Sequence, residues 1–115
     1  TTGTPTLLFV IRLNTTNVIT FTARTGINNA SNQSFIVEGD IVVRSVGSTG
    51  TVMGSGRVSF NTAAGVDTVE TVVNNAATTI DTTVEQTLQV SAQWSAASAS
   101  NTTTLKSLIV ELSDY

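Results

Sequence analysis

The chain has 115 residues, of which 40% are hydrophobic and only 11% are charged, and its formal net charge at pH 7 is −3. This length suits one domain with a single core, and the five basic residues, scattered along the chain, exclude a positive stripe that would bind a nucleic-acid backbone. The chain has no Cys and no His, which excludes disulfides, thiol or imidazole catalysis and the usual zinc ligands. We therefore expect no cofactor, no metal and no nucleic-acid partner. The longest apolar run, Leu7–Ile11, is too short for membrane insertion.

The low charge also bears on assembly. Thr and Val favour extended backbone, whereas Lys, Glu and Leu, which favour helices, are scarce, so the composition predicts β-structure with hydroxyl and amide groups on its surface. Strand edges that lack charged residues tend to pair with neighbouring chains. We therefore expect a stable homo-oligomer, a trimer in the first instance, with a lone sandwich as the alternative.

The first predicted strand is Thr6–Leu13, and both of its faces carry apolar side chains. Such a strand is either central in a sheet or covered on its second face by a partner. Asn14–Asn17 is a polar tetrapeptide of the kind that closes a hairpin. We expect Val18–Thr25 to follow it and to pair antiparallel with the first strand.

The longest strand is predicted to start at Ser34, after a polar surface loop over Gly26–Gln33. Its alternation places one set of side chains inward, namely Phe35, Val37, Gly39, Ile41 and Val43. A turn at Ser45–Gly50 then joins this strand to Thr51–Asn61, whose inward set includes Gly54 and Gly56. Alternate glycines on an inward face leave space for a large neighbour.

The stretch Leu88–Ser95 has the cleanest alternation of apolar and polar residues in the chain. A strand here would bury one complete face, and that face includes Trp94, the only tryptophan. We therefore predict that this strand forms the centre of the core. Trp94 should fill the space left by Gly54 and Gly56, which is a more probable role by periodicity than a sugar-stacking platform.

Shorter elements complete the predicted order. Asn61–Thr68 is expected to be a loop, Val69–Val73 and Thr78–Asp81 short strands, and Asn101–Leu112 a closing strand after Val84–Ser95. Seven or eight short strands with turn signals between them predict an all-β, antiparallel β-sandwich of jelly-roll type, as one domain over residues 1–115. Because the chain opens in turn residues, it fits the C-terminal part of a longer protein.

Two pairs of carboxylates are candidates for catalytic or calcium-binding groups. Glu38 and Asp40 lie two residues apart on one strand face, and Asp67 and Glu70 flank a loop. Outward carboxylates on strands are more often solvated or paired with a cross-strand base, for which Arg57 is the candidate. We therefore expect no catalytic residue.

Several strand ends and turns share a pattern with a known group of proteins. These are Thr2–Leu7; Glu38–Arg44 with Gly47 and Gly50–Val52; Asp81–Thr83 with Gln93–Trp94; and Ala99–Thr102. The series resembles C-terminal jelly-roll domains of tailed-bacteriophage virion surface proteins, which are tail fibres, tail spikes, head fibres and capsid-decorating proteins. The resemblance spans nearly the whole chain, and it implies a homotrimer around a threefold axis on the surface of the virion.

The function that the resemblance implies is non-enzymatic: a trimeric tail-fibre or spike tip that recognises a host receptor, such as a surface glycan. Alternatives are a capsid-decorating protein that contacts other virion proteins, a glycan-degrading tailspike domain, or a carbohydrate-binding module of an exported bacterial protein. Loops carry such contacts because the sandwich holds them rigidly. The candidate contact residues are Asn28, Asn29, Asn32, Ser48, Thr49, Ala64, Asp67, Ser98, Ser100 and Asn101.

Overall fold

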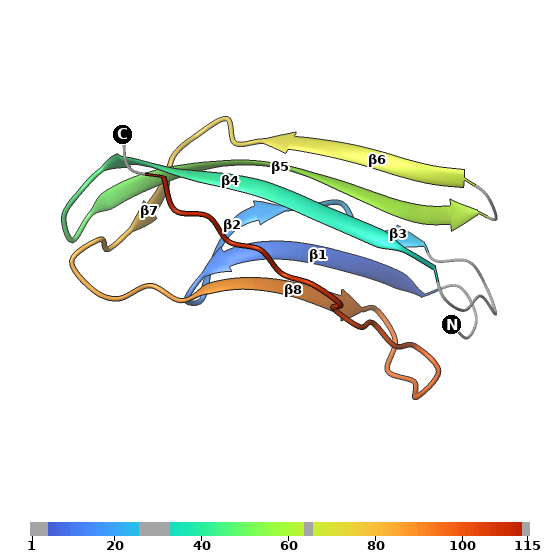
Figure 1. Ribbon diagram of the computed structural model, residues 1–115. Helices are drawn as coiled ribbons and strands as arrows, with labels where there is room; N and C mark the ends of the chain where they lie inside the picture. Colours follow the sequence, from blue (N-terminus) through green and yellow to red (C-terminus); the bar gives the residue numbers. More distant parts are fainter. Residues whose placement is uncertain (1–4, 26–32, 64–65, 114–115) are drawn as a thin grey trace.

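The computed structural model describes residues 5–25, 33–63 and 66–113, and its strands form a two-layer sandwich (Figure 1). Eight strands lie in these ranges, in two antiparallel sheets of four strands each, and no helix occurs among the described residues. The predicted all-β sandwich is therefore confirmed.

The first sheet is organised around β1, which has a strand along each edge. β8 pairs with β1 over its whole length, from Leu7 opposite Trp94 to Leu13 opposite Leu88. β2 and β3 share the other edge. The strands are β1 (Thr6–Leu13), β2 (Thr16–Thr20), β3 (Arg24–Thr25) and β8 (Leu88–Trp94). β1 is therefore the central strand of its sheet, which is one of the two arrangements expected for it.

The predicted hairpin partner, one strand over Val18–Thr25, is interrupted. Residues 21–23 leave the ladder between β2 and β3, although the Phe21 N–H still donates to the Phe9 carbonyl at 3.1 Å. This break turns the Phe21 side chain into the core, where it is only 2% exposed. The tight turn before β2 is made possible by Asn14, whose φ of 50° is a conformation that Asn tolerates.

The second sheet is organised around β5 in the same way. β4 pairs with β5 over nearly all of its length, and β6 and β7 share the opposite edge of β5. The strands are β4 (Phe35–Ser45), β5 (Gly50–Ala63), β6 (Val66–Val73) and β7 (Thr78–Ile80). The loop predicted over Asn61–Thr68 was wrong, because Asn61 and Asp67 are opposite each other in the β5–β6 ladder. Strand pairing gives hydrogen-bond partners to backbone N–H and C=O groups that would lack them in a loop.

The core lies between the sheets and comes mainly from β1, β2 and β5. Phe9 contacts two other aromatic rings, with centroid distances of 4.9 Å to Phe35 and 6.1 Å to Phe60. The buried cluster consists of Leu7, Phe9, Ile11, Val18, Ile19, Phe21, Val52, Val58, Phe60 and Ile80. β8 contributes no member to this cluster, only half-buried side chains at its margin.

The prediction that Trp94 fills the space above the two glycines of β5 was wrong. A Cβ atom on Gly54 would lie 2.6 Å from Ile19 Cγ1, and one on Gly56 would lie 3.0 Å from Phe21 Cζ. β2 and the residue that follows it therefore fill that space. β5 faces β2 across the sandwich, whereas Trp94 lies on the far edge of the first sheet and is only half-buried.

The prediction that Leu88–Ser95 is the centre of the core was also wrong. On the predicted inward face Leu88 is 40% exposed, Ala92 is exposed, and Val90 is only half-buried. Alternation predicts which side chains share a face, but β8 is an edge strand, so that face is only partly covered.

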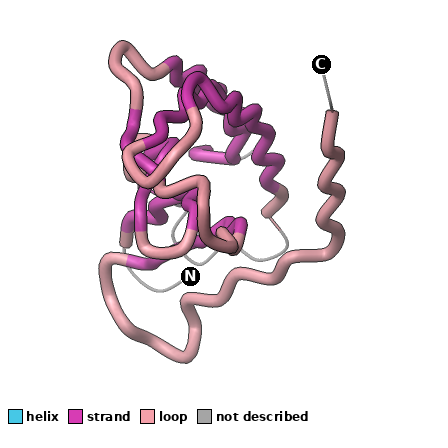
Figure 2. Tube along the Cα trace, turned by 90° about the vertical axis from the view of Figure 1, so that its left-hand side faces the viewer, coloured by secondary structure: helices cyan, strands magenta, loops and turns pink. Residues whose placement is uncertain are grey.

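The closing strand predicted over Asn101–Leu112 does not form. The chain from Thr102 to Ser113 lacks regular structure, and all of its side chains are exposed. Figure 2 shows the last stretch of this segment standing apart from the strands.

Candidate functional site: the open side of the sandwich

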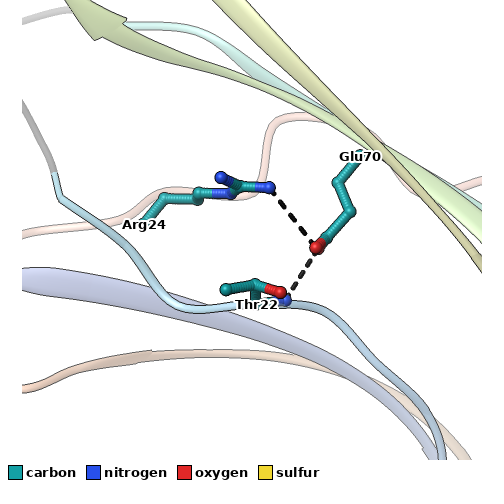
Figure 3. Close-up of polar contacts among 3 residues, drawn as sticks. All are labelled: Thr22, Arg24 and Glu70. Atoms are coloured by element: carbon teal, nitrogen blue, oxygen red, sulfur yellow. Dashed lines mark hydrogen bonds and ion pairs between the residues drawn. The ribbon is translucent and has the colours of Figure 1, made fainter.

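The two long sides of the sandwich differ, and the side where β2 and β3 face β6 is bridged by polar contacts. Glu70 on β6 accepts hydrogen bonds from the Thr22 N–H at 2.7 Å and from Arg24 Nη2 at 3.3 Å (Figure 3). Asn74 Nδ2 donates to the Val18 carbonyl at 3.0 Å. These contacts join the two sheets, and we call this the closed side.

The charge of Glu70 stabilises the closed side in a pH-dependent way. Burial raises its pKa, but the hydrogen bonds from Thr22 and the charge of Arg24 outweigh burial, so the pKa of Glu70 lies below its ordinary value of 4.5. A carboxylate with a lowered pKa in the folded state adds stability above its unfolded pKa. That contribution is lost as the pH falls through the folded-state value.

We therefore expect Glu70→Gln to lower the free energy of unfolding at pH 7 by about 1 kcal/mol. The cost should shrink as the pH falls below 4.5, the ordinary value for this carboxyl. Urea unfolding at a series of pH values measures both effects. Some acid sensitivity should persist in the variant, because hydrogen bonds from Thr83 also lower the pKa of Asp81.

Glu38→Gln is the matched control for this experiment. Glu38 also pairs with an arginine, Arg57, at 3.1 Å, but both side chains are more than half exposed. Exposed ion pairs contribute little to stability. An equal loss in the two variants would contradict the bridging role of Glu70.

The opposite side, between the outer edges of β4 and β8, has no such bridge among the described residues, and we call it the open side. A groove of about 220 Å³ enters the sandwich there. Its lining is mainly apolar and aromatic, and consists of Phe9, Phe35, Val90, Ser91, Ala92, Thr103 and Leu105. The core is therefore accessible from this side.

Side chains beside the groove are incompletely buried. On β4 the inward residues Phe35, Val37 and Ile41 pack on the core but are only half-buried. On β8 the indole Nε1 of Trp94 is shielded from solvent and has no hydrogen-bond acceptor among the described residues. An edge strand or a partner on this side would complete the burial of these groups.

The outer face and edge of β4 add apolar surface next to the groove. On the outer face Ile36 is 61% exposed and Val42 43%, and Val43, which was predicted to be inward and lies opposite the buried Val52, is 54% exposed. The outer edge of this eleven-residue strand pairs with no other described strand. Long unpaired edges with exposed apolar side chains are sites of association with another chain.

A second groove, of about 340 Å³, lies over the outer face of β4, β5 and β6. It contains the carboxylate pair considered from the sequence, Glu38 and Asp40. Glu38 pairs with Arg57 directly across the strands, as expected. Of the second pair, Asp67 accepts a hydrogen bond from Asn61 and Glu70 is bound to the closed side.

The predicted contact residues do not form one site, because the structure places them at both ends of the sandwich. Ser48 and Thr49 are exposed in the turn between β4 and β5. Asp67, Ser98 and Ser100 are exposed at the opposite end. Asn28, Asn29, Asn32 and Ala64 lie outside the described residues.

Asn101 is not an exposed loop residue as expected, because it is only 9% exposed. Its N–H donates to the Ser98 carbonyl at 3.0 Å, and its Nδ2 donates to the Ala96 carbonyl at 3.2 Å. The side chain therefore organises its own loop. This correction could not come from composition, since Asn is common both in exposed turns and in turns that it stabilises.

The end that holds Ser48 and Thr49 is braced by the chain between β7 and β8. Thr82 Oγ1 accepts from the Gly47 N–H at 2.7 Å. The Asn14 N–H donates to the Thr87 carbonyl, and the Thr87 N–H donates to Asn14 Oδ1, both at 2.8 Å. These contacts explain why β8 starts at Leu88 and not at Val84 as predicted, since residues 81–87 link two turns instead of joining a sheet.

The apolar surface of β4 is the feature that the sequence interpretation missed. A signal was present: Ile36 and Val42 occupy outward positions of a strand whose inward positions are also apolar. That pattern is typical of a strand in contact with neighbours on both faces.

Among the described residues no three Asp or Glu side chains gather as metal ligands would. The same residues include no helix with the length and apolar character needed to cross a membrane.

Comparison of the chain with protein-family models, curated proteins and solved structures finds no match. The fold and the site thus define the molecule: a small antiparallel β-sandwich with one bridged side and one open, apolar side.

Proposed function

We propose that the protein is a non-enzymatic structural and binding module that works as a homo-oligomer assembled through its open side. One observation carries the proposal: at this side half-buried core residues and exposed apolar residues meet along an unpaired strand edge. An exposed, long, apolar strand edge is a template for pairing with another chain. A trimer is the favoured state, because the phage-like pattern of strand ends and turns implies threefold packing.

The proposed setting is the surface of a bacteriophage particle, at a tail-fibre or spike tip that recognises a host receptor. The jelly-roll-like order of strands belongs to this proposal and is supported by the resemblance in sequence. The exposed loops at the two ends, which include Ser48, Thr49, Ser98 and Ser100, would then be free for a receptor glycan or for other virion proteins. A capsid-decorating role is the second candidate, supported by the same resemblance.

Light scattering coupled to size-exclusion chromatography tests the assembly. We expect a mass of three chains at micromolar concentration and dissociation by Ile36→Glu, which puts a charge on the open side. Val69→Glu is the matched control, because Val69 is 57% exposed against 61% for Ile36 but lies on β6. A monomer at every concentration, or dissociation by the control alone, would contradict the proposal.

Imaging of the particle with an antibody against this chain tests the setting. Label at the tail tip supports receptor binding, whereas label over the icosahedral shell supports capsid decoration. Absence of label from intact particles would contradict both.

A further inference from the structure

The chain from Thr102 to Ser113 has the properties of a strand without a sheet. It is apolar on both faces, and its exposed side chains include Leu105 at 55%, Leu108 at 59%, Ile109 at 81% and Val110 at 61%. No hydrogen bond joins residues 102–113 to the described strands. Unpaired backbone groups beside large apolar side chains favour addition to a sheet edge.

The outer edge of β4 has the length that such a strand needs. β4 contains eleven residues and β8 only seven. A strand of about ten residues can therefore form a full ladder on β4 but overhangs β8. The groove on the open side also reaches β4, at Phe35.

The edges of β4 and β8 also differ in the side chains on their two faces. A strand that is apolar on both faces requires apolar neighbours on both faces of the edge that it joins. β4 offers Phe35, Val37 and Ile41 on the inner face, and on its outer face Ile36 and Val42 flank the charged pair Glu38 and Asp40. β8 carries polar residues on its outer face, namely Gln89, Ser91 and Gln93.

Chain direction disfavours closure of the segment on β4 of its own copy. The segment leaves the end of β8 that is fixed by the Ser95 N–H, which donates to the Thr6 carbonyl at 2.9 Å. From there it runs in the same direction as β4 (Figure 1). Pairing within one copy would therefore be parallel. β4 of another copy can be approached antiparallel, which is the more stable arrangement.

We propose that residues 102–113 add as an antiparallel edge strand to β4 of a second copy, so that the copies are joined by exchanged strands. This inference rests on the proposed homo-oligomer and names the segment that holds it together. Each copy then donates one strand and accepts one. In the exchange, Thr103 and Leu105 leave the groove of their own copy, and the segment of the other copy covers the half-buried inner face of β4.

Cross-linking between single-cysteine variants tests the exchange, because the natural chain has no Cys. Val110→Cys is placed on the segment, and Ile36→Cys or Val42→Cys on β4 of a copy with a different tag. After mixing, a short bismaleimide should link the two tags in most chains. Val110→Cys with Thr71→Cys, an exposed position on β6, is the matched control and should give less than a tenth of that product.

The double variant Val42→Cys/Val110→Cys distinguishes closure within a copy from exchange. Exchange gives covalent oligomers from one preparation, whereas internal closure gives a cross-linked monomer and overturns the proposal. The proposal is also overturned if Val110→Cys cross-links to neither Ile36→Cys nor Val42→Cys. It is overturned as well if the Thr71→Cys control gives an equal yield of cross-linked product.

Substitutions in the segment test strand exchange independently of the proposed homo-oligomer. Leu108→Asp/Val110→Asp should weaken association by at least roughly tenfold, while circular dichroism shows the strands intact. Val73→Asp, 64% exposed on β6, is the control. If the double variant associates as strongly as the wild type, strand exchange is overturned but the proposed homo-oligomer is not. A wild-type chain that is monomeric at every concentration overturns the oligomer itself.

Discussion

Phe21→Ala is expected to lower the free energy of unfolding by about 3–5 kcal/mol, the cost of removing a large side chain from a packed core. Phe21 is 2% exposed and lies where the β2–β3 edge turns into the sandwich. Its ring sits against the backbone of Gly56. Few atoms can move into the space that it leaves, because β5 is held by strands along both edges.

Urea unfolding at one fixed chain concentration measures this loss, since assembly makes stability depend on concentration. Trp94→Ala is the control. The larger but half-buried indole should cost less, about 1–2 kcal/mol. A greater loss for Trp94 than for Phe21 would mean that the core is centred on β8 after all.

Gly54→Ala is the second large effect, with an expected loss of about 1–3 kcal/mol from overpacking. The added Cβ would lie 2.6 Å from Ile19 Cγ1 and 3.0 Å from Val18 Cγ1. Both contacts are with buried side chains of β2, so relief requires the two sheets to separate. Ser55→Ala, which changes the opposite face of the same strand, should stay within about 0.5 kcal/mol of the wild type.

A double-mutant cycle identifies the cause of that loss. Ile19→Ala alone should cost about 2–5 kcal/mol, because Ile19 is fully buried. In the double variant Gly54→Ala/Ile19→Ala the clash with Cγ1 is gone, so the combined loss should be smaller than the sum. Additive losses would mean that Gly54 is required for a reason other than its contact with β2.

Local patterns were sufficient for most of the strands. Apolar residues on both faces of Thr6–Leu13 correctly indicated a strand with neighbours on either side, and Asn14 correctly marked a tight turn. The alternation over Phe35–Arg44 correctly separated Val37 and Ile41 from Glu38. These signals depend on side chains that are near neighbours along one strand, so no long-range information is needed.

The candidate site depended on strand order, which alternation does not encode. Trp94 and Phe21 have equally apolar neighbours in the sequence, yet only Phe21 faces the glycines of β5. Likewise Ser48 and Ser98 are both exposed polar loop residues, but the path of the strands between them places them at opposite ends of the sandwich. Such facts follow from which strands are adjacent.

By itself the sequence determined the β class, the strands with strong alternation and the absence of Cys and His chemistry, because these properties belong to single residues or to neighbours along the chain. Only the tertiary structure decided that Glu70 bridges one side while the other side stays open along β4 and β8. The burial of a side chain depends on the strand that is packed against it, and that strand comes from a distant part of the chain.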